Sequence, residues 1–267
     1  MNPRLSSVFE TARAEGRAAL IGYLPAGFPD HRSSVELFHA MTDAGVDAIE
    51  VGLPYSDPLM DGPAIQEAVS MALEAGTTTD VVLDIVEQIS GHGATALVMS
   101  YWNPIERYGV QRFAERLASA GGVGVITPDL TPEEAGPWTA ATDAFGIDRV
   151  FLVAPSSTQV RIDTVTSATT GFVYAASTMG VTGARGQVSS AAPELVARVR
   201  EATKLPIAVG LGVSTAAQAQ DVARYSDGVI VGSAFVNAIL EATDLAAALR
   251  AVSKLATELS AGVRGEA

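Results

Sequence analysis

The sequence contains no cysteine, few basic residues and no long apolar run. Without cysteine, disulfides and thiolate metal sites are excluded. Lys and Arg total 17 against 30 Asp and Glu, and the formal charge of −13 disfavours binding to nucleic acid or to anionic membranes. No segment approaches the roughly 18 consecutive apolar residues of a membrane span, and residues 1–16 lack a signal-peptide pattern. We therefore expect a soluble, cytoplasmic protein without nucleic-acid or membrane partners.

Histidine is also scarce, which bears on metal and cofactor chemistry. The three histidines, His31, His39 and His92, lack the spacing of metal ligands. We interpret them as solvent-exposed helix or loop residues without partners. No nucleotide or flavin fingerprint is present, so we expect neither a metal nor a cofactor.

Eight short apolar, β-branched runs alternate with helical segments along the chain. Continuous runs of Val, Ile and Leu are typical of strands that are buried on both faces of a parallel sheet. Eight strand–helix repeats predict an α/β fold, a closed (β/α)8 TIM barrel in one domain, 1–267, with extra N-terminal and loop helices. The long second connection leaves room for one such helix within 65–90. The expected strands occupy 18–24, 48–52, 95–101, 123–128, 148–154, 171–177, 206–212 and 227–233.

Several connections carry helix-start signals. Ser33 and Glu36 have capping-box spacing, and Gly45 follows as a stop signal. Thr131 precedes a proline, and Ser214 precedes a run of good helix formers. We predict that helices begin at Ser33, Thr131 and Ser214.

Glu50 and Asp61 are the candidate acid–base pair. In a TIM barrel the chemistry lies at the carboxyl ends of the strands, and Glu50 is near the end of the second strand. A glutamate in an apolar strand loses several kcal/mol of hydration unless it is compensated, whereas Asp61 lies in the following loop. Two carboxylates in different surroundings can hold different pKa values and divide acid and base roles. Alternatively, Glu50 forms a salt bridge inside the barrel and Asp61 caps a helix that begins near Pro63.

Glycines after the last two expected strands indicate a phosphate site. Gly210, Gly212 and Gly232 permit close backbone approach, and Ser233 begins an apolar helix whose free N–H groups face an anion. Such glycines are also ordinary turn formers. Because both groups follow the strands at which this fold usually binds phosphate, we favour a phosphate site.

Three tyrosines and one long loop complete the candidate site. Tyr23, Tyr101 and Tyr174 lie near strand ends, where they either line a pocket for a planar group or pack the barrel core. Segment 177–190 is long and rich in small residues. Its composition suits a lid that closes over substrate and a disordered surface loop almost equally well.

Taken together, these motifs resemble the tryptophan synthase alpha subunit family over nearly the whole chain. The most specific motif is the glutamate strand followed by S-D-P-L-x-D-G-P. The matching segments are "LIGYLPAGFPD" (20–30), "DAIEVGLPYSDPLMDGPAIQ" (47–66), "MSYWNPIERYG" (99–109), "TPDLTPEE" (127–134), "FVYAASTMGVTGAR" (172–185), and "VGLGVSTAAQA" through "GVIVGSAFV" (209–236).

The resemblance implies a cofactor-independent lyase of tryptophan biosynthesis. Its reaction is retro-aldol cleavage of indole-3-glycerol phosphate to indole and glyceraldehyde 3-phosphate. By family analogy Asp61 accepts from the indole nitrogen, Glu50 moves protons at the side-chain hydroxyl and at C3, and Tyr174 supplies a supporting hydroxyl. Thr182 resembles the lid threonine that hydrogen-bonds the loop aspartate when the site closes.

The resemblance also implies binding residues and a partner. The expected partner is the tryptophan synthase beta subunit in an alpha2beta2 complex. The implied phosphate donors are Gly183, Gly212, Gly232 and Ser233; the indole contacts are Tyr23, Ile65 and Tyr101; and the partner surface is Pro54, Asp57, Pro58, Asn103 and Pro104.

Three other functions stay open at this point. A sugar-phosphate isomerase or epimerase would place a catalytic Lys or His, or metal ligands, at strand ends, where none is visible. A non-catalytic regulatory subunit would have no need of Glu50, Asp61 and Thr182. A stand-alone indole-producing lyase shares the same signature.

Overall fold

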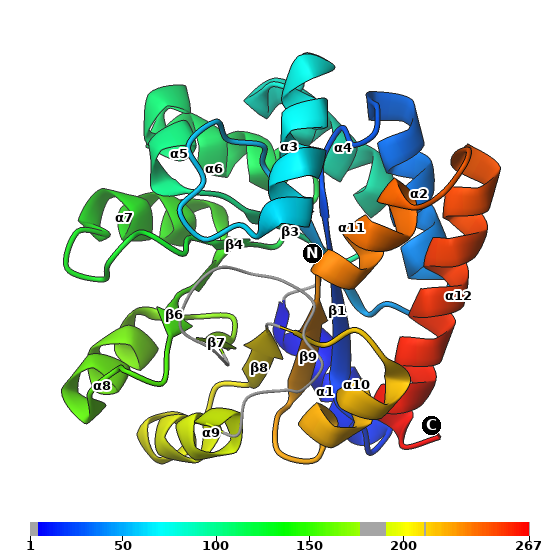
Figure 1. Cartoon of the computed structure of the whole chain (residues 1–267). Coiled ribbons are helices and arrows are strands. Elements are labelled where there is room, and N and C mark those ends of the chain that lie inside the picture. The colour runs from blue at the N-terminus through cyan, green and yellow to red at the C-terminus, as the bar shows by residue number, and fades with distance from the viewer. Residues whose placement is uncertain (1–4, 177–190, 211, 267) are drawn as a thin grey trace.

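The computed structural model describes residues 5–176, 191–210 and 212–266, and they form a parallel barrel surrounded by helices (Figure 1). The predicted TIM barrel is confirmed. No helix within these ranges is long and apolar enough to cross a membrane. The strands are β1 (Ala19–Pro25), β2 (Ala48–Gly52), β3 (Ala96–Met99), β4 (Gly124–Ile126), β5 (Asp148–Val150), β6 (Leu152–Val153), β7 (Val173–Ala176), β8 (Ile207–Gly210) and β9 (Gly228–Val231).

The barrel closes through one continuous stretch of backbone. The fifth expected strand is divided into β5 and β6, with Phe151 between them. β5 pairs with β4, and β6 pairs with β7, so the two ends of the sheet are joined covalently. The eight predicted strands are therefore all present, one of them in two parts.

The helices form the outer layer and fill the long second connection. Between β2 and β3 there are two helices, α3 and α4, which confirms the expected insertion within 65–90. The helices are α1 (Leu5–Ala14), α2 (His31–Asp43), α3 (Pro63–Glu74), α4 (Thr79–Gly91), α5 (Trp102–Tyr108), α6 (Val110–Ser119), α7 (Gly136–Phe145), α8 (Gln159–Ala168), α9 (Ala191–Ala202), α10 (Ala216–Ala223), α11 (Ser233–Leu240) and α12 (Leu245–Arg264).

Strand alternation separates two apolar cores. Along β2, Ile49 and Val51 belong to the core between the barrel and its helices, whereas Ala48 belongs to the core inside the barrel. Because side chains alternate along a strand, Glu50 points the same way as Ala48, into the barrel. The fold therefore places this carboxyl group one layer above an apolar interior.

Helix α1 closes the amino-terminal end of the barrel. Leu5 and Phe9 belong to the interior core together with buried residues of β1 to β5 and β7 to β9. Three glycines make room for them: a Cβ on Gly124 or Gly171 would lie 2.7 or 2.8 Å from Leu5, and one on Gly228 would lie 2.9 Å from Phe9. These separations are too short for a methyl group, so the small residues at the base of the barrel are matched to the helix.

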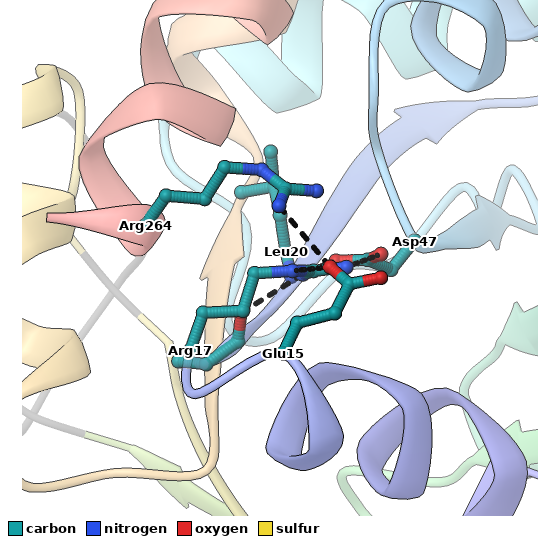
Figure 2. A network of polar contacts seen from close by, with 6 residues as sticks. Glu15, Arg17, Leu20, Asp47 and Arg264 are labelled. Carbon is teal, nitrogen blue, oxygen red and sulfur yellow. Dashed lines mark hydrogen bonds and ion pairs between the residues drawn. The ribbon is translucent and has the colours of Figure 1, made fainter. Parts of the chain in front are cut away.

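A polar network joins the ends of the chain below the barrel (Figure 2). Arg17 donates to both carboxylate oxygens of Asp47, at 2.6 and 2.7 Å, and to Glu15 at 2.6 Å. Glu15 also accepts from Arg264 at the end of α12, at 3.1 Å. Asp47 in turn accepts from the backbone N–H of Leu20 at 2.8 Å. The network connects α1, α12 and the starts of β1 and β2.

The predicted start of α2 is wrong by a few residues. The helix begins at His31, and its N-cap is Asp30. The Asp30 carboxylate accepts from the Ser33 N–H at 3.0 Å and from the Ser33 hydroxyl at 2.6 Å. Since an aspartate three positions upstream of Ser33 supplies the cap, Ser33 becomes a buried residue of the first turn.

Helices α7 and α10, unlike α2, begin later than predicted. The stretch after Thr131 forms a turn, in which the Glu134 N–H bonds the Thr131 carbonyl at 3.0 Å. Pro137 occupies the first turn of α7, where its missing N–H costs nothing, whereas it would break a longer helix. At α10 the cap is Thr215, because the Ser214 hydroxyl donates instead to the side chain of Gln218.

The expectation that the histidines lack partners is wrong. The rings of His39 and His92 stack with centroids 3.9 Å apart, and His92 Nε2 lies 2.9 Å from Asp43 Oδ1. His31 Nε2 lies 3.1 Å from Thr77 Oγ1. These contacts join residues of α2 to residues at the two ends of α4, which are distant in the sequence. Among the described residues, no cluster of three or more His, Asp or Glu could hold a metal ion.

Candidate active site

Glu50 is a buried carboxyl group inside the barrel. In the strand register it lies beside Tyr23 of β1 and Leu97 of β3, and it is 1% exposed. Its Oε1 has no hydrogen-bond partner in the described part of the chain, and no cation there forms an ion pair with it. Burial raises the pKa of Glu50 to about 8. The salt-bridge alternative is therefore wrong, and the acid is largely protonated at neutral pH.

Asp61 occupies the end of the loop that follows β2. It is 8% exposed, and its Oδ1 accepts from the Tyr101 hydroxyl at 3.1 Å. Burial raises the pKa of Asp61, and the Tyr101 hydrogen bond acts against this rise. The N-cap position of α3 is occupied by Gly62 and not by Asp61, so the helix-cap alternative for Asp61 is wrong. The two carboxyl groups differ as expected: among the described residues Glu50 Oε1 has no hydrogen-bond partner, whereas Asp61 Oδ1 accepts from Tyr101.

Tyr101 contacts the catalytic loop through three hydrogen bonds. Besides donating to Asp61, its oxygen accepts from the backbone N–H groups of Leu59 at 3.1 Å and Met60 at 2.9 Å. From the sequence, only the position of Tyr101 near a strand end pointed to the site, and these three bonds could not be predicted. Tyr101 and Asp61 are 40 positions apart in the sequence, so no local sequence pattern indicates that they are hydrogen-bonded.

Glycines at the top of the barrel make room for the other two tyrosines. A Cβ on Gly52 would lie 2.5 Å from the Tyr23 hydroxyl oxygen, and one on Gly232 would lie 3.2 Å from the same ring. A Cβ on Gly210 would overlap the Tyr174 hydroxyl. Gly210, expected beside a phosphate, therefore also accommodates an aromatic ring.

Both tyrosines stay neutral and are available as hydrogen-bond donors. Burial, with a contribution from the negative charge of Glu50, raises the pKa of Tyr174 well above its usual value. The pKa of Tyr23 is raised well above its usual value by burial and by the charges of Asp61 and Glu50. Phenol hydroxyls thus share the interior with both carboxyl groups.

The expected phosphate residues lie at the ends of adjacent strands. Gly212 follows β8 and has a positive φ of 88°, which favours glycine. Gly232 follows β9 and is the N-cap of α11, and a glycine has no side chain with which to cap the helix. Ser233 is the first residue of α11, as predicted. Because β8 and β9 are paired, both loops open at the same edge of the barrel.

The remaining candidate residues are Ile65, two residues of segment 177–190 and the expected partner surface. Ile65 is buried in the first turn of α3, close in sequence to Asp61. Thr182 and Gly183, with the whole of segment 177–190, lie outside the described residues. In the expected partner surface Pro54 is buried, Asp57 and Asn103 are exposed, and Pro58 and Pro104 are half-buried.

Comparison with known proteins gives the same family over the full chain. A family model described as tryptophan synthase alpha chain matches residues 9–264. The tryptophan synthase alpha chain of Thermobifida fusca (strain YX) is 59% identical and covers 96% of each chain, and that of Nocardia farcinica is 56% identical and covers 98% of this chain and 96% of the relative.

Solved structures agree with the sequence relatives. A chain in a structure of Mycobacterium tuberculosis tryptophan synthase is 54% identical, with a TM-score of 0.93 over 99% of each chain. The tryptophan synthase alpha chain of Legionella pneumophila is 33% identical, with a TM-score of 0.85 over 98% of this chain and 97% of that one. The chain therefore belongs to the family of tryptophan synthase alpha chains, lyases of tryptophan biosynthesis.

Proposed function

We propose that this chain cleaves indole-3-glycerol phosphate to indole and glyceraldehyde 3-phosphate in the cytoplasm, as the alpha subunit of tryptophan synthase. The observation that carries the proposal is the buried Glu50, protonated at neutral pH, in a barrel that also holds Asp61 on the next loop. These two residues supply the two kinds of carboxyl group that the reaction requires.

Glu50 accounts for the proton transfers at the bond that breaks. Cleavage separates indole C3 from the first side-chain carbon, so C3 must gain a proton and the hydroxyl on the departing carbon must lose one. A carboxylic acid with a pKa of about 8 can donate the first proton and, as a carboxylate, accept the second. The proton balance closes on Glu50 alone, and no cofactor is needed.

Asp61 and Tyr174 stabilise the charge that develops on the way. Protonation of C3 makes the ring nitrogen positive, and a carboxylate that accepts from its N–H stabilises that charge. Asp61 is the acceptor in this proposal. The Tyr174 hydroxyl, which burial keeps neutral by raising its pKa well above the usual value, supports the reacting hydroxyl.

The remaining expected residues bind the two ends of the substrate. Backbone N–H groups at Gly212, Gly232 and Ser233, with the start of α11, favour a phosphate, and Gly183 would add a further donor. The indole ring packs against Tyr23, Ile65 and Tyr101.

The proposed partner is a beta subunit that consumes indole, in an alpha2beta2 complex. Supporting this, the relatives are called alpha chains and the similar solved structure is of tryptophan synthase. The loop between β2 and α3 carries an exposed Leu59, 74% accessible, next to the expected partner residues. These residues are Pro54, Asp57, Pro58, Asn103 and Pro104.

An indole-release assay tests the proposal, with Glu50→Gln as the paired variant. We expect indole from the wild-type chain, faster release with added beta subunit, and a loss of at least about a hundredfold in Glu50→Gln, the low end for removing a general acid or base. Binding of glycerol phosphate should survive in the variant. No indole from the wild type with saturating partner would refute the proposal, and a rate that is indifferent to the partner would indicate a stand-alone lyase.

A further inference from the structure

We propose that Tyr101 is a positioning residue that fixes the Asp61 carboxylate and couples it to the backbone of the loop formed by residues 53–62. This inference rests on the proposed function of Asp61. It assigns to the Tyr101 hydroxyl a role beyond that of an aromatic wall for indole.

The direction of each hydrogen bond follows from the chemistry of the groups. A backbone N–H can only donate, so the Tyr101 oxygen accepts from Leu59, at 3.1 Å, and from Met60, at 2.9 Å. A phenol has one proton, and the remaining contact is the 3.1 Å bond to Asp61 Oδ1. The hydroxyl must therefore donate to the carboxylate. With both lone pairs and its proton engaged, it has no free hydrogen-bonding capacity for the substrate.

Tyr101 itself is held firmly at the start of α5. It is 5% exposed, and the next residue, Trp102, donates its backbone N–H to Asp129 at 2.9 Å. Two residues along, Asn103 donates to the Tyr55 hydroxyl at 2.9 Å, and the rings of Tyr55 and Tyr101 lie 5.6 Å apart. The start of α5 thus contacts the 53–62 loop at two separate places.

These contacts have a consequence for Asp61. With Oδ1 bonded to Tyr101, the carboxylate has Oδ2 left to accept from the substrate N–H. The backbone N–H groups of Leu59 and Met60 donate to the same phenol oxygen that donates to Asp61. A displacement of either residue therefore moves the Tyr101 hydroxyl, and with it the Asp61 carboxylate. Because the Leu59 side chain is exposed, a partner that contacts this loop would act on Asp61 through Tyr101.

The direct test compares Tyr101→Phe with the control Tyr55→Phe. Tyr101→Phe keeps the ring but removes all three bonds, whereas Tyr55→Phe removes the Asn103 contact and leaves Asp61 untouched. We expect Tyr101→Phe to lower kcat about ten- to a hundredfold, the range for a lost hydrogen bond to a charged group, with KM within about threefold. Tyr55→Phe should change kcat by less than about threefold.

The pH profile separates positioning from packing. The Tyr101 bond lowers the Asp61 pKa, so its loss should raise that pKa and move the acid limb of kcat/KM to higher pH. Both variants keep Tyr23, the other titratable side chain on which the charge of Asp61 acts, and both keep Glu50. Because Glu50 determines the alkaline limb, that limb should stay in place. A Tyr101→Phe enzyme with normal kcat and a normal acid limb would overturn the inference.

A spectroscopic measurement keeps this test independent of the proposed activity. Carboxyl-labelled aspartate reports the Asp61 pKa by NMR, and amide hydrogen exchange reports Leu59 and Met60. In the wild type these two amides should exchange more slowly than those of Ser56 and Asp57, and Tyr101→Phe should remove the protection and raise the Asp61 pKa. Fast exchange in the wild type refutes the inference even if the variant does not fold, whereas failure of wild-type indole release refutes only the proposed function.

Discussion

At the scale of single residues, the site depends on two carboxyl groups in different surroundings, Glu50 and Asp61. Glu50 is fully buried, and its Oε1 has no partner within the part of the chain that the structure describes, so the protein holds it as a neutral acid. Ionisation of this buried group lowers the stability of the fold. Asp61 has a phenol donor, which favours the carboxylate. The difference lies in the surroundings, because the side-chain chemistry of the two groups is the same.

This difference predicts a bell-shaped pH profile for kcat/KM. Asp61 must be ionised and Glu50 protonated, so activity should rise as Asp61 loses its proton and fall as Glu50 ionises, with an alkaline midpoint near pH 8. Steady-state indole release between pH 5 and 10 measures both limbs. A flat profile above neutrality would contradict the assignment of Glu50 as the acid.

The same pKa predicts how stability depends on pH. Glu50 has a pKa of about 8 in the folded protein against an ordinary value of 4.5, so the folded state binds more protons than the unfolded state between those values. Stability of the wild type should therefore fall, relative to Glu50→Gln, as pH rises through this window. At one pKa unit per about 1.4 kcal/mol, the variant should gain more than about 1 kcal/mol between pH 5 and pH 8.5. Urea unfolding of both proteins at pH 5 and pH 8.5 measures the gain. The same difference in unfolding free energy between the two proteins at both pH values would contradict the prediction.

At this scale, sequence reasoning found the carboxyl groups but missed how they are held. An isolated glutamate in an apolar strand is a local anomaly, so Glu50 stands out in the sequence. The Tyr101 contact joins residues 40 positions apart, and it depends on how a loop folds back, which no local pattern encodes. The cap at Asp30 was missed for a related reason, because Ser33 fits the same pattern and only the geometry selects between them.

At the scale of elements, glycines at both ends of the barrel determine what its interior can hold. At the base, Gly124, Gly171 and Gly228 receive the side chains of α1, and at the top Gly52 and Gly210 receive tyrosine rings. The eight strands could be predicted from their apolar runs, because burial on both faces leaves a clear signal. The way α1 fills the base could not be predicted, because it depends on which strand positions face inward.

The matched pair Gly124→Ala and Gly136→Ala tests this packing. A Cβ on Gly124 would lie 2.7 Å from Leu5 and 3.2 Å from the Asp148 carbonyl oxygen, whereas one on Gly136 has open space. We expect Gly124→Ala to lose about 1–3 kcal/mol of unfolding free energy, the usual cost of overpacking, and Gly136→Ala to lose none. Leu5→Ala should lower the unfolding free energy less in the Gly124→Ala background than in the wild type, because it removes the side chain that the new methyl group meets. Equal stability of the two glycine variants would show that α1 does not pack here as described.

At the scale of the whole molecule, the two ends of the barrel have different roles. The amino-terminal end is filled by α1 and joined below by the network of Glu15, Arg17, Asp47 and Arg264 (Figure 2), which suits a structural role. The carboxyl end carries both catalytic candidates and the 53–62 loop. Partner binding and chemistry are therefore proposed for the same end, and the resemblance to a family, more than any single motif, made this predictable.

The exposed apolar residues provide the last test, of the partner surface. Leu59 and Val160 are similarly exposed, at 74% and 75%, but Leu59 lies on the 53–62 loop and Val160 on α8. A charge introduced into a partner interface must be desolvated, so Leu59→Asp should weaken binding of the beta subunit at least about tenfold, whereas Val160→Asp should leave it unchanged. Indole release without partner should be preserved in both, since the hydrogen bond from Leu59 to Tyr101 is donated by the backbone N–H, which the substitution keeps. Calorimetric titration of the beta subunit into each variant measures the effect, and equal affinities would place the partner surface elsewhere.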